Sequence, residues 1–114
     1  MKIKEIAELV EGEVVGSKDN EEYEMTTAFC SDLMSDVLRY SLENTILLTG
    51  LCNIQTMRTA EMADLSVVLI GRGKQPDEEM LDLAQESGIT IIKSKFSLFR
   101  ICAILASAGL KPLY

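Results

Sequence analysis

Three short apolar runs limit the fold of this chain more than any other feature. They lie at residues 46–48, 67–70 and 89–92, and polar residues do not alternate with apolar ones in them as they do in a half-buried strand. Strands that are covered by helices on both faces have this appearance. The segments between and after the runs have apolar residues at helical spacing. The resulting order, strand-helix repeated three times, predicts a parallel sheet with right-handed crossovers.

The chain has 114 residues, the size of one compact domain, so we expect a single domain over residues 1–114. The expected fold is a small layered α/β domain with a mainly parallel sheet, in which a helix and short strands precede the strand-helix core. The core strands are expected at residues 45–49, 66–70 and 89–92, and the core helices at 53–64, 77–87 and 96–108.

Shorter elements are expected before the core. The pattern predicts a helix at residues 3–11, short strands at 13–15 and 25–30, and a solvated turn at 17–24. A further helix should follow Ser31 or Asp32, either of which would cap it. Its buried face would carry Leu33, Met34, Val37 and Leu38.

The composition excludes several classes of function. There is no histidine, so histidine-based acid-base catalysis, Ser-His or Cys-His pairs and histidine-ligated metals are excluded for the chain alone. No G-x-x-x-x-G-K-[ST] string is present, which excludes a nucleotide-hydrolysing P-loop. The net charge of -7 opposes nucleic-acid binding, and no apolar run approaches the roughly 20 residues that span a bilayer. We expect no independent enzyme, no cofactor or metal, and neither nucleic acid nor membrane as a partner.

The cysteines indicate a reducing environment. Cys30, Cys52 and Cys102 are odd in number and include no Cys-x-x-Cys pair, which fits neither a disulfide framework nor a zinc site. A cytoplasmic location is therefore expected. Cys52 follows the first core strand, where a helix N-terminus would lower its thiol pKa, but the chain has no histidine to act as its base. Cys30 and Cys102 are expected to be small buried apolar residues.

The positive charge is concentrated late in the chain, where a parallel sheet would place a ligand. Residues 1–71 hold five basic and thirteen acidic side chains, whereas residues 72–114 hold six and five. Ligands of open parallel sheets bind beyond the carboxyl ends of the strands. The candidate ligand-binding residues at these ends are Thr49, Gly50, Asn53, Gly71, Arg72, Gly73, Lys74 and Ser94. Glycines would let backbone N–H groups approach an anion and the cations would neutralise it, so a small phosphorylated ligand is expected.

A purely structural interpretation of the same residues stays open. The glycines would then serve tight turns, the lysines would keep the loops hydrated, and Asn53 would cap a helix. Asp32 and Asp36, one helical turn apart, have the spacing to hold a divalent cation, but capping by Asp32 and hydration of Asp36 explain them more simply.

The last expected helix is apolar on nearly every side. Between residues 96 and 108 its only charged side chain is Arg100. A helix on the surface of a monomer has a polar face, so this one is either deeply buried or covered by a second subunit. We favour a homodimer with this helix at the interface.

The ordered set of motifs resembles a stand-alone DRTGG-domain protein. The resemblance rests on residues 3–15, 28–38 (AFCSDLMSDVL), 47–50 (LLTG), 70–79 (IGRGKQPDEE) and 95–99 (KFSLF). Such domains are similar to the N-terminal domain of HPr kinase and of Mur ligases, and also occur beside CBS domains in regulated pyrophosphatases. The resemblance implies a regulatory or dimerising module, with an adenine nucleotide as the natural ligand.

The expected function is therefore that of a non-enzymatic regulatory and dimerisation domain that senses a small phosphorylated ligand. Two alternatives stay open: a pure interaction module that docks on a metabolic enzyme, and an accessory part of an HPr-kinase-like phosphotransfer system.

Overall fold

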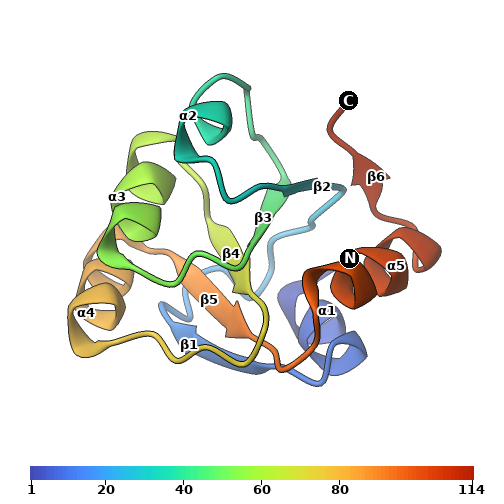
Figure 1. Ribbon diagram of the computed structural model, residues 1–114, viewed down its shortest axis with the longest axis horizontal. Helices are drawn as coiled ribbons and strands as arrows, with labels where there is room; N and C mark the ends of the chain where they lie inside the picture. The colour runs from blue at the N-terminus through green and yellow to red at the C-terminus, as the bar shows by residue number, and fades with distance from the viewer.

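A six-stranded sheet lies between two layers of helices (Figure 1). The computed structural model describes all 114 residues. The strands are β1 (Glu13–Gly16), β2 (Thr27–Cys30), β3 (Thr45–Thr49), β4 (Val67–Ile70), β5 (Thr90–Lys93) and β6 (Lys111–Pro112). Their order is β1-β5-β4-β3-β2-β6, and only β1 is antiparallel to its neighbour. The expected α/β fold with a mainly parallel sheet is confirmed, while β6 was not predicted.

The helices divide between the two faces of the sheet. They are α1 (Ile3–Leu9), α2 (Met34–Val37), α3 (Ile54–Met62), α4 (Glu78–Ser87) and α5 (Leu98–Ser107). Figure 1 shows α2, α3 and α4 on one face, and α1 and α5 on the other. Within β3, Ile46 and Leu48 belong to the core beneath α1 and α5, whereas Leu47 belongs to the core beneath α3 and α4. Because both faces are dry, β4 is apolar at every position and so are the three middle residues of β3.

Side-chain caps determine where three of the helices begin. Asn53 Oδ1 accepts from Thr56 N at 3.1 Å and Asp77 Oδ1 accepts from Met80 N at 2.9 Å. Ser97 Oγ accepts from Arg100 N at 3.2 Å in the same way. Each bond satisfies an N–H group that has no partner within its own helix. α4 ends at Ser87, and the Gly88 that caps it has a left-handed φ of 70°.

The segment from residue 17 to 24 is fixed to the sheet, which corrects the expectation of a solvated turn. Ser17 and Asn20 are buried. Asn20 Nδ2 lies 3.0 Å from Ser66 O, 2.7 Å from Gly88 O and 3.1 Å from Thr90 Oγ1. Thr90 Oγ1 in turn donates to Ser17 O at 2.7 Å. A buried amide thus joins the turn to the starts of β4 and β5.

The helix expected after Asp32 is shorter and differently placed than predicted. α2 has four residues, begins after Leu33 and has no side-chain cap. Only Val37 of the expected apolar face is buried, whereas Leu33 and Leu38 are exposed. The capping role assigned to Asp32 is therefore wrong. None of the helices is long and apolar enough to cross a bilayer.

Replacing Asn20 with alanine should lower the free energy of unfolding by about 2 kcal/mol, because buried acceptors around it lose their donor. The matched control is Asp19→Ala, since Asp19 is the exposed neighbour and should change stability by less than about 0.5 kcal/mol. Urea unfolding followed by circular dichroism measures both. Equal effects for the two variants would contradict a structural role for the Asn20 amide.

Candidate functional site

The carboxyl ends of the parallel strands meet at one border of the sheet, here called the carboxyl edge. It carries the loops that follow β2, β3, β4 and β5. The loop after β4 leads to α4 on one face and the loop after β5 leads to α5 on the other, although β4 and β5 are neighbours. Connections that leave neighbouring strands toward opposite faces define the position where open α/β sheets bind ligands.

The Asp32 carboxylate is held at this edge by the loop that follows β3. Its Oδ1 atom accepts from Thr49 Oγ1 at 2.7 Å and from Gly50 N at 2.8 Å. These two hydrogen bonds are the main reason that the pKa of Asp32 lies below its usual range, and the nearby cations Arg72 and Lys74 lower it further. The sequence did not reveal this role, because nothing local to residue 32 indicates the distant donors.

Arg72 lies over Gly50. A Cβ atom on Gly50 would lie 3.1 Å from Arg72 Cδ, 3.2 Å from Arg72 Nη1 and 3.6 Å from Asp32 Oδ2. Arg72 and Gly73 both have a left-handed backbone, with φ of 70° and 73°. For arginine this conformation is uncommon, and such residues gather at functional sites. The Asp32 carboxylate and the Arg72 guanidinium thus both lie close to Gly50, where the loops that follow β3 and β4 converge.

The backbone N–H groups of these loops bind acceptors within the protein. Gly71 N donates to Thr49 O at 3.0 Å, Arg72 N to Phe96 O at 2.8 Å and Gly73 N to Ser94 O at 2.9 Å. Gly50 N likewise donates to a group of the protein, the Asp32 carboxylate, at 2.8 Å. These four N–H groups hold the loops together, and the side chains of Arg72 and Lys74 beside them are exposed.

Two of the other candidate residues have structural partners. Asn53 caps α3. Ser94 is 3% exposed, and its hydroxyl donates to Val10 O at 2.8 Å and accepts from Phe96 N at 3.2 Å. These contacts match the structural interpretation of both residues.

A polar hollow of about 170 Å³ lies beside the carboxyl edge, between the loops and β1. Gly73, Lys74 and Ser94 line it, together with Lys93 and Lys95. The Lys93 ammonium lies 2.6 Å from Gln75 Oε1 and 3.2 Å from Glu13 Oε2. The predicted site is therefore divided: Thr49, Gly50 and Arg72 surround Asp32, Gly73 and Ser94 face the hollow, and Lys74 contributes its charge to both places.

Cys52 is not activated by its position before α3. Burial raises the pKa of its thiol, and the opposing effect of Lys74 is smaller. The prediction that the helix N-terminus lowers this pKa is therefore wrong.

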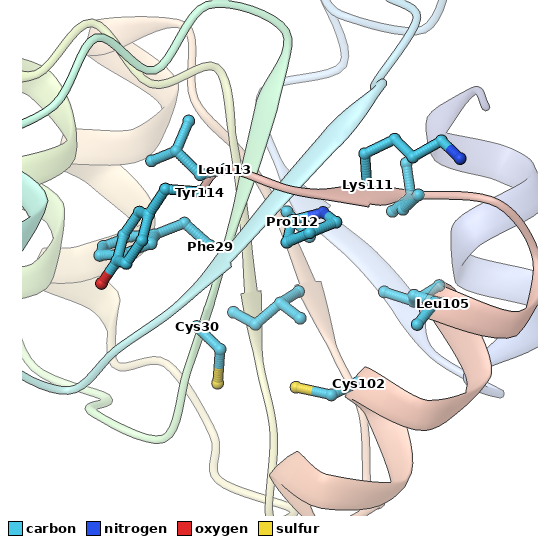
Figure 2. A pocket seen from close by; sticks show the side chains of 12 residues that line it. Phe29, Cys30, Cys102, Leu105, Lys111, Pro112, Leu113 and Tyr114 are labelled. Atoms are coloured by element: carbon cyan, nitrogen blue, oxygen red, sulfur yellow. The ribbon is translucent and has the colours of Figure 1, made fainter.

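A second cavity, here called the apolar pocket, is distinct from the polar hollow and shares none of its lining residues. It has a volume of about 380 Å³ and opens between β2, α5 and the C-terminal segment (Figure 2). Figure 2 shows the thiols of Cys30 and Cys102 turned toward the same space at its base. Burial raises the pKa of the Cys30 thiol to about 12, and the neighbouring Cys102 thiol contributes to the shift. Cys30 therefore adds no charge to the base of the pocket. Cys30 is nevertheless exposed and Cys102 half-buried, so the expectation that both are buried is wrong.

Aromatic rings close one end of the apolar pocket. Tyr114 stacks on Tyr40 with ring centroids 5.0 Å apart, and its ring centroid lies 6.2 Å from that of Phe29. Sequence reasoning missed this cavity because its walls come from β2, α5 and the last five residues, and only the pairing of β6 with β2 brings them together.

Comparison with known proteins identifies the class of domain. The model of the DRTGG domain family matches residues 5–108, so this chain belongs to the DRTGG domain family. No curated protein has a significant sequence match to the chain.

A solved structure shares the fold. It is the crystal structure of the CBS and DRTGG domains of the regulatory region of Clostridium perfringens pyrophosphatase, in complex with the activator diadenosine tetraphosphate. The TM-score is 0.76 at 13% sequence identity, over 96% of this chain and 47% of that one. This chain therefore spans about half the length of that regulatory region.

Replacing Asp32 with alanine should lower the free energy of unfolding by about 1–2 kcal/mol at pH 7, because two hydrogen bonds are lost. The loss is smaller than for a fully buried carboxylate, because Asp32 is partly exposed. Because the pKa of Asp32 is lowered in the folded protein, its contribution is present above the ordinary aspartate value of about 3.9 and is lost as the pH falls through the folded value. The difference from the wild type should therefore shrink in acid.

Chemical unfolding at pH 7 and pH 3 checks this dependence. Asp36→Ala is the control, because Asp36 has only a 3.7 Å ion pair with the exposed Arg39. A loss of stability for Asp32→Ala that is the same at both pH values would contradict the stabilising role of the charged carboxylate.

Proposed function

We propose that this chain is a regulatory domain without catalytic activity, and that it senses a small phosphorylated ligand of the adenine nucleotide class at the carboxyl edge. Arg72 and Lys74 would bind the phosphate. Asp32 would accept a hydrogen bond from a sugar hydroxyl or an adenine amino group.

The observation that carries this proposal is the closeness of Asp32 to the cations Arg72 and Lys74 of the β4 loop. Oδ1 of Asp32 takes both hydrogen bonds from the β3 loop, so Oδ2 remains available as an acceptor. The side chains of Arg72 and Lys74 are exposed beside it. A nucleotide offers the complementary pair, an anionic phosphate and several neutral donors, within one molecule.

The overall charge favours a small ligand over a polymer. The chain carries -7 in total, so a long polyanion would meet repulsion from most of its surface. A single phosphate group meets only the local cations. Exposed charge-assisted hydrogen bonds of this kind give modest affinity, as suits a sensor of abundant metabolites.

The solved structure with the same fold supports the proposed ligand class, but less directly than the residues of this chain do. The regulatory region of which it is part binds a diadenosine tetraphosphate activator. That region contains CBS domains as well, and this chain matches about half of it. The assignment of an adenine nucleotide to the carboxyl edge of this chain is therefore part of the proposal.

A second candidate function, the docking of a protein partner, is favoured by the exposure of α5. Phe99 is 85% exposed on this helix. The expectation of a metabolic enzyme as partner, and that of an HPr-kinase-like role, stay predictions; phosphotransfer would require a partner to supply the P-loop that this sequence lacks.

Calorimetric titration with AMP, ADP and ATP tests the ligand proposal. The wild type should bind at least one of them in the micromolar to millimolar range, and the double variant Arg72→Ala/Lys74→Ala should bind at least tenfold more weakly, since each lost ionic hydrogen bond costs about 1.5–3 kcal/mol. The matched control is Lys18→Ala/Arg58→Ala, which removes the same charge elsewhere on the surface.

Two outcomes would overturn the proposal. One is the absence of heat of binding for the wild type at millimolar nucleotide. The other is equal affinity for both double variants, which would show that only the overall charge matters.

A further inference from the structure

α5 presents an apolar stripe that nothing in the chain covers. Ile101 and Leu105 fix one side of the helix in the core. Another side carries Phe99, Cys102, Ala103 and Ala106, which follow the i, i+3, i+4, i+7 spacing of a single helical face. Phe99, Ala103 and Ala106 are exposed, and Cys102 is half-buried. The apolar sequence of this helix is therefore not explained by deep burial within one chain.

The stripe continues directly into the apolar pocket. Cys102 and Ala106 belong to both features. Phe99 lies two helical turns before Ala106 on the same face but does not line the pocket of its own chain. One surface therefore carries a large projecting ring and, beside it, a hollow with room for such a ring.

We propose that this surface binds a second copy of the chain through a two-fold axis, with Phe99 of each protomer inserted into the apolar pocket of the other. The partner thereby completes a cavity that a single protomer leaves open.

The positions along the stripe support a two-fold axis. If two copies of α5 pack antiparallel, with the axis between positions 102 and 103, then position 99 lies opposite 106 and position 102 lies opposite 103. Each member of the stripe thus faces another member of the stripe. The large Phe99 meets the small Ala106, which lines the pocket, and the small pair Cys102 and Ala103 lets the helices approach closely at the axis.

The charged side chains at this place are few, and they are the basic residues Arg100 on α5 and Lys111 at the pocket. A chain with a net charge of -7 repels its own kind over most of its surface. However, neither α5 nor the lining of the apolar pocket contains an acidic side chain. This surface therefore brings no carboxylate side chain of one copy against the same region of the other.

The available area is sufficient for an interface of ordinary size. Phe99 is 85% exposed and Tyr114, at the rim of the pocket, is 80% exposed. A buried aromatic side chain removes roughly 150–250 Å² from water, so these two residues from both protomers supply on the order of 600 Å². The helix stripes and pocket walls would add the rest of the roughly 1,200–2,000 Å² that stable interfaces bury.

Light scattering with size-exclusion chromatography tests the dimer and its position. The wild type should have twice the chain mass of 12.6 kDa at tens of micromolar concentration. Phe99→Asp should weaken dimerisation at least 100-fold, because it removes an anchoring aromatic ring and places a charge in an apolar pocket. Ala106→Phe should have the same effect, because it fills the hollow. Both positions are exposed in the protomer, so both variants should fold, as circular dichroism would confirm.

Met62→Asp is the matched control. Met62 is 69% exposed on α3, in the other helix layer, and its replacement should leave the dimer unchanged. A monomeric wild type at several hundred micromolar would overturn the proposal. So would a dimer that persists in both Phe99→Asp and Ala106→Phe.

Cross-linking locates the axis independently. A variant that retains only Cys102, made by Cys30→Ser and Cys52→Ser, should form a covalent dimer with a short bismaleimide, whereas a variant that retains only Cys52 should not. Failure of the Cys102-only dimer to cross-link would contradict the proposed axis. Nucleotide titration of the Phe99→Asp monomer separates this interface from the carboxyl edge: loss of the dimer with nucleotide binding retained leaves the proposed function intact.

Discussion

Burial of the central strands on both faces is the constraint on which the rest of the structure depends. Leu47, Val68 and Ile91 contribute to one core, and the apolar residues next to them in sequence contribute to the other. A sheet of this kind needs a helical layer on each side, and parallel strands need crossovers that supply those layers. The connections that follow the parallel strands β2 to β5 then all leave from the carboxyl edge. That edge collects Asp32 and the β4 loop without any need for these residues to be close in sequence.

The same topology produces the exposed face of α5. After β5 the chain crosses the opposite face of the sheet and returns to pair β6 with β2. α5 is the element that makes this crossing. It can bury only the side that carries Ile101 and Leu105, while the C-terminal segment beyond it closes a pocket against β2. The proposed ligand edge and the proposed dimer face are thus separate products of one chain path.

The sequence was sufficient to predict an element or a contact wherever the interaction that determines it is local. The apolar runs located β3, β4 and β5 to within a residue or two, and Asn53 caps its helix as its sequence position indicates. It was insufficient wherever the partner lies far away. Asn20 bonds groups 46 to 70 residues distant, and Asp32 bonds a loop 17 to 18 residues away. Both residue types are common in solvated turns and caps, and only the folded chain distinguishes these roles.

The most direct test of the ligand proposal is an amide NMR titration of the wild-type protein with ADP. If the nucleotide binds at the carboxyl edge, the amide signals of Gly50, Arg72 and Gly73 should shift in a saturable manner, because a phosphate beside Arg72 disturbs the loops that these N–H groups join. The signals of α5 should move little. Absence of any shift at millimolar ADP, or shifts confined to the residues around the apolar pocket, would contradict the account.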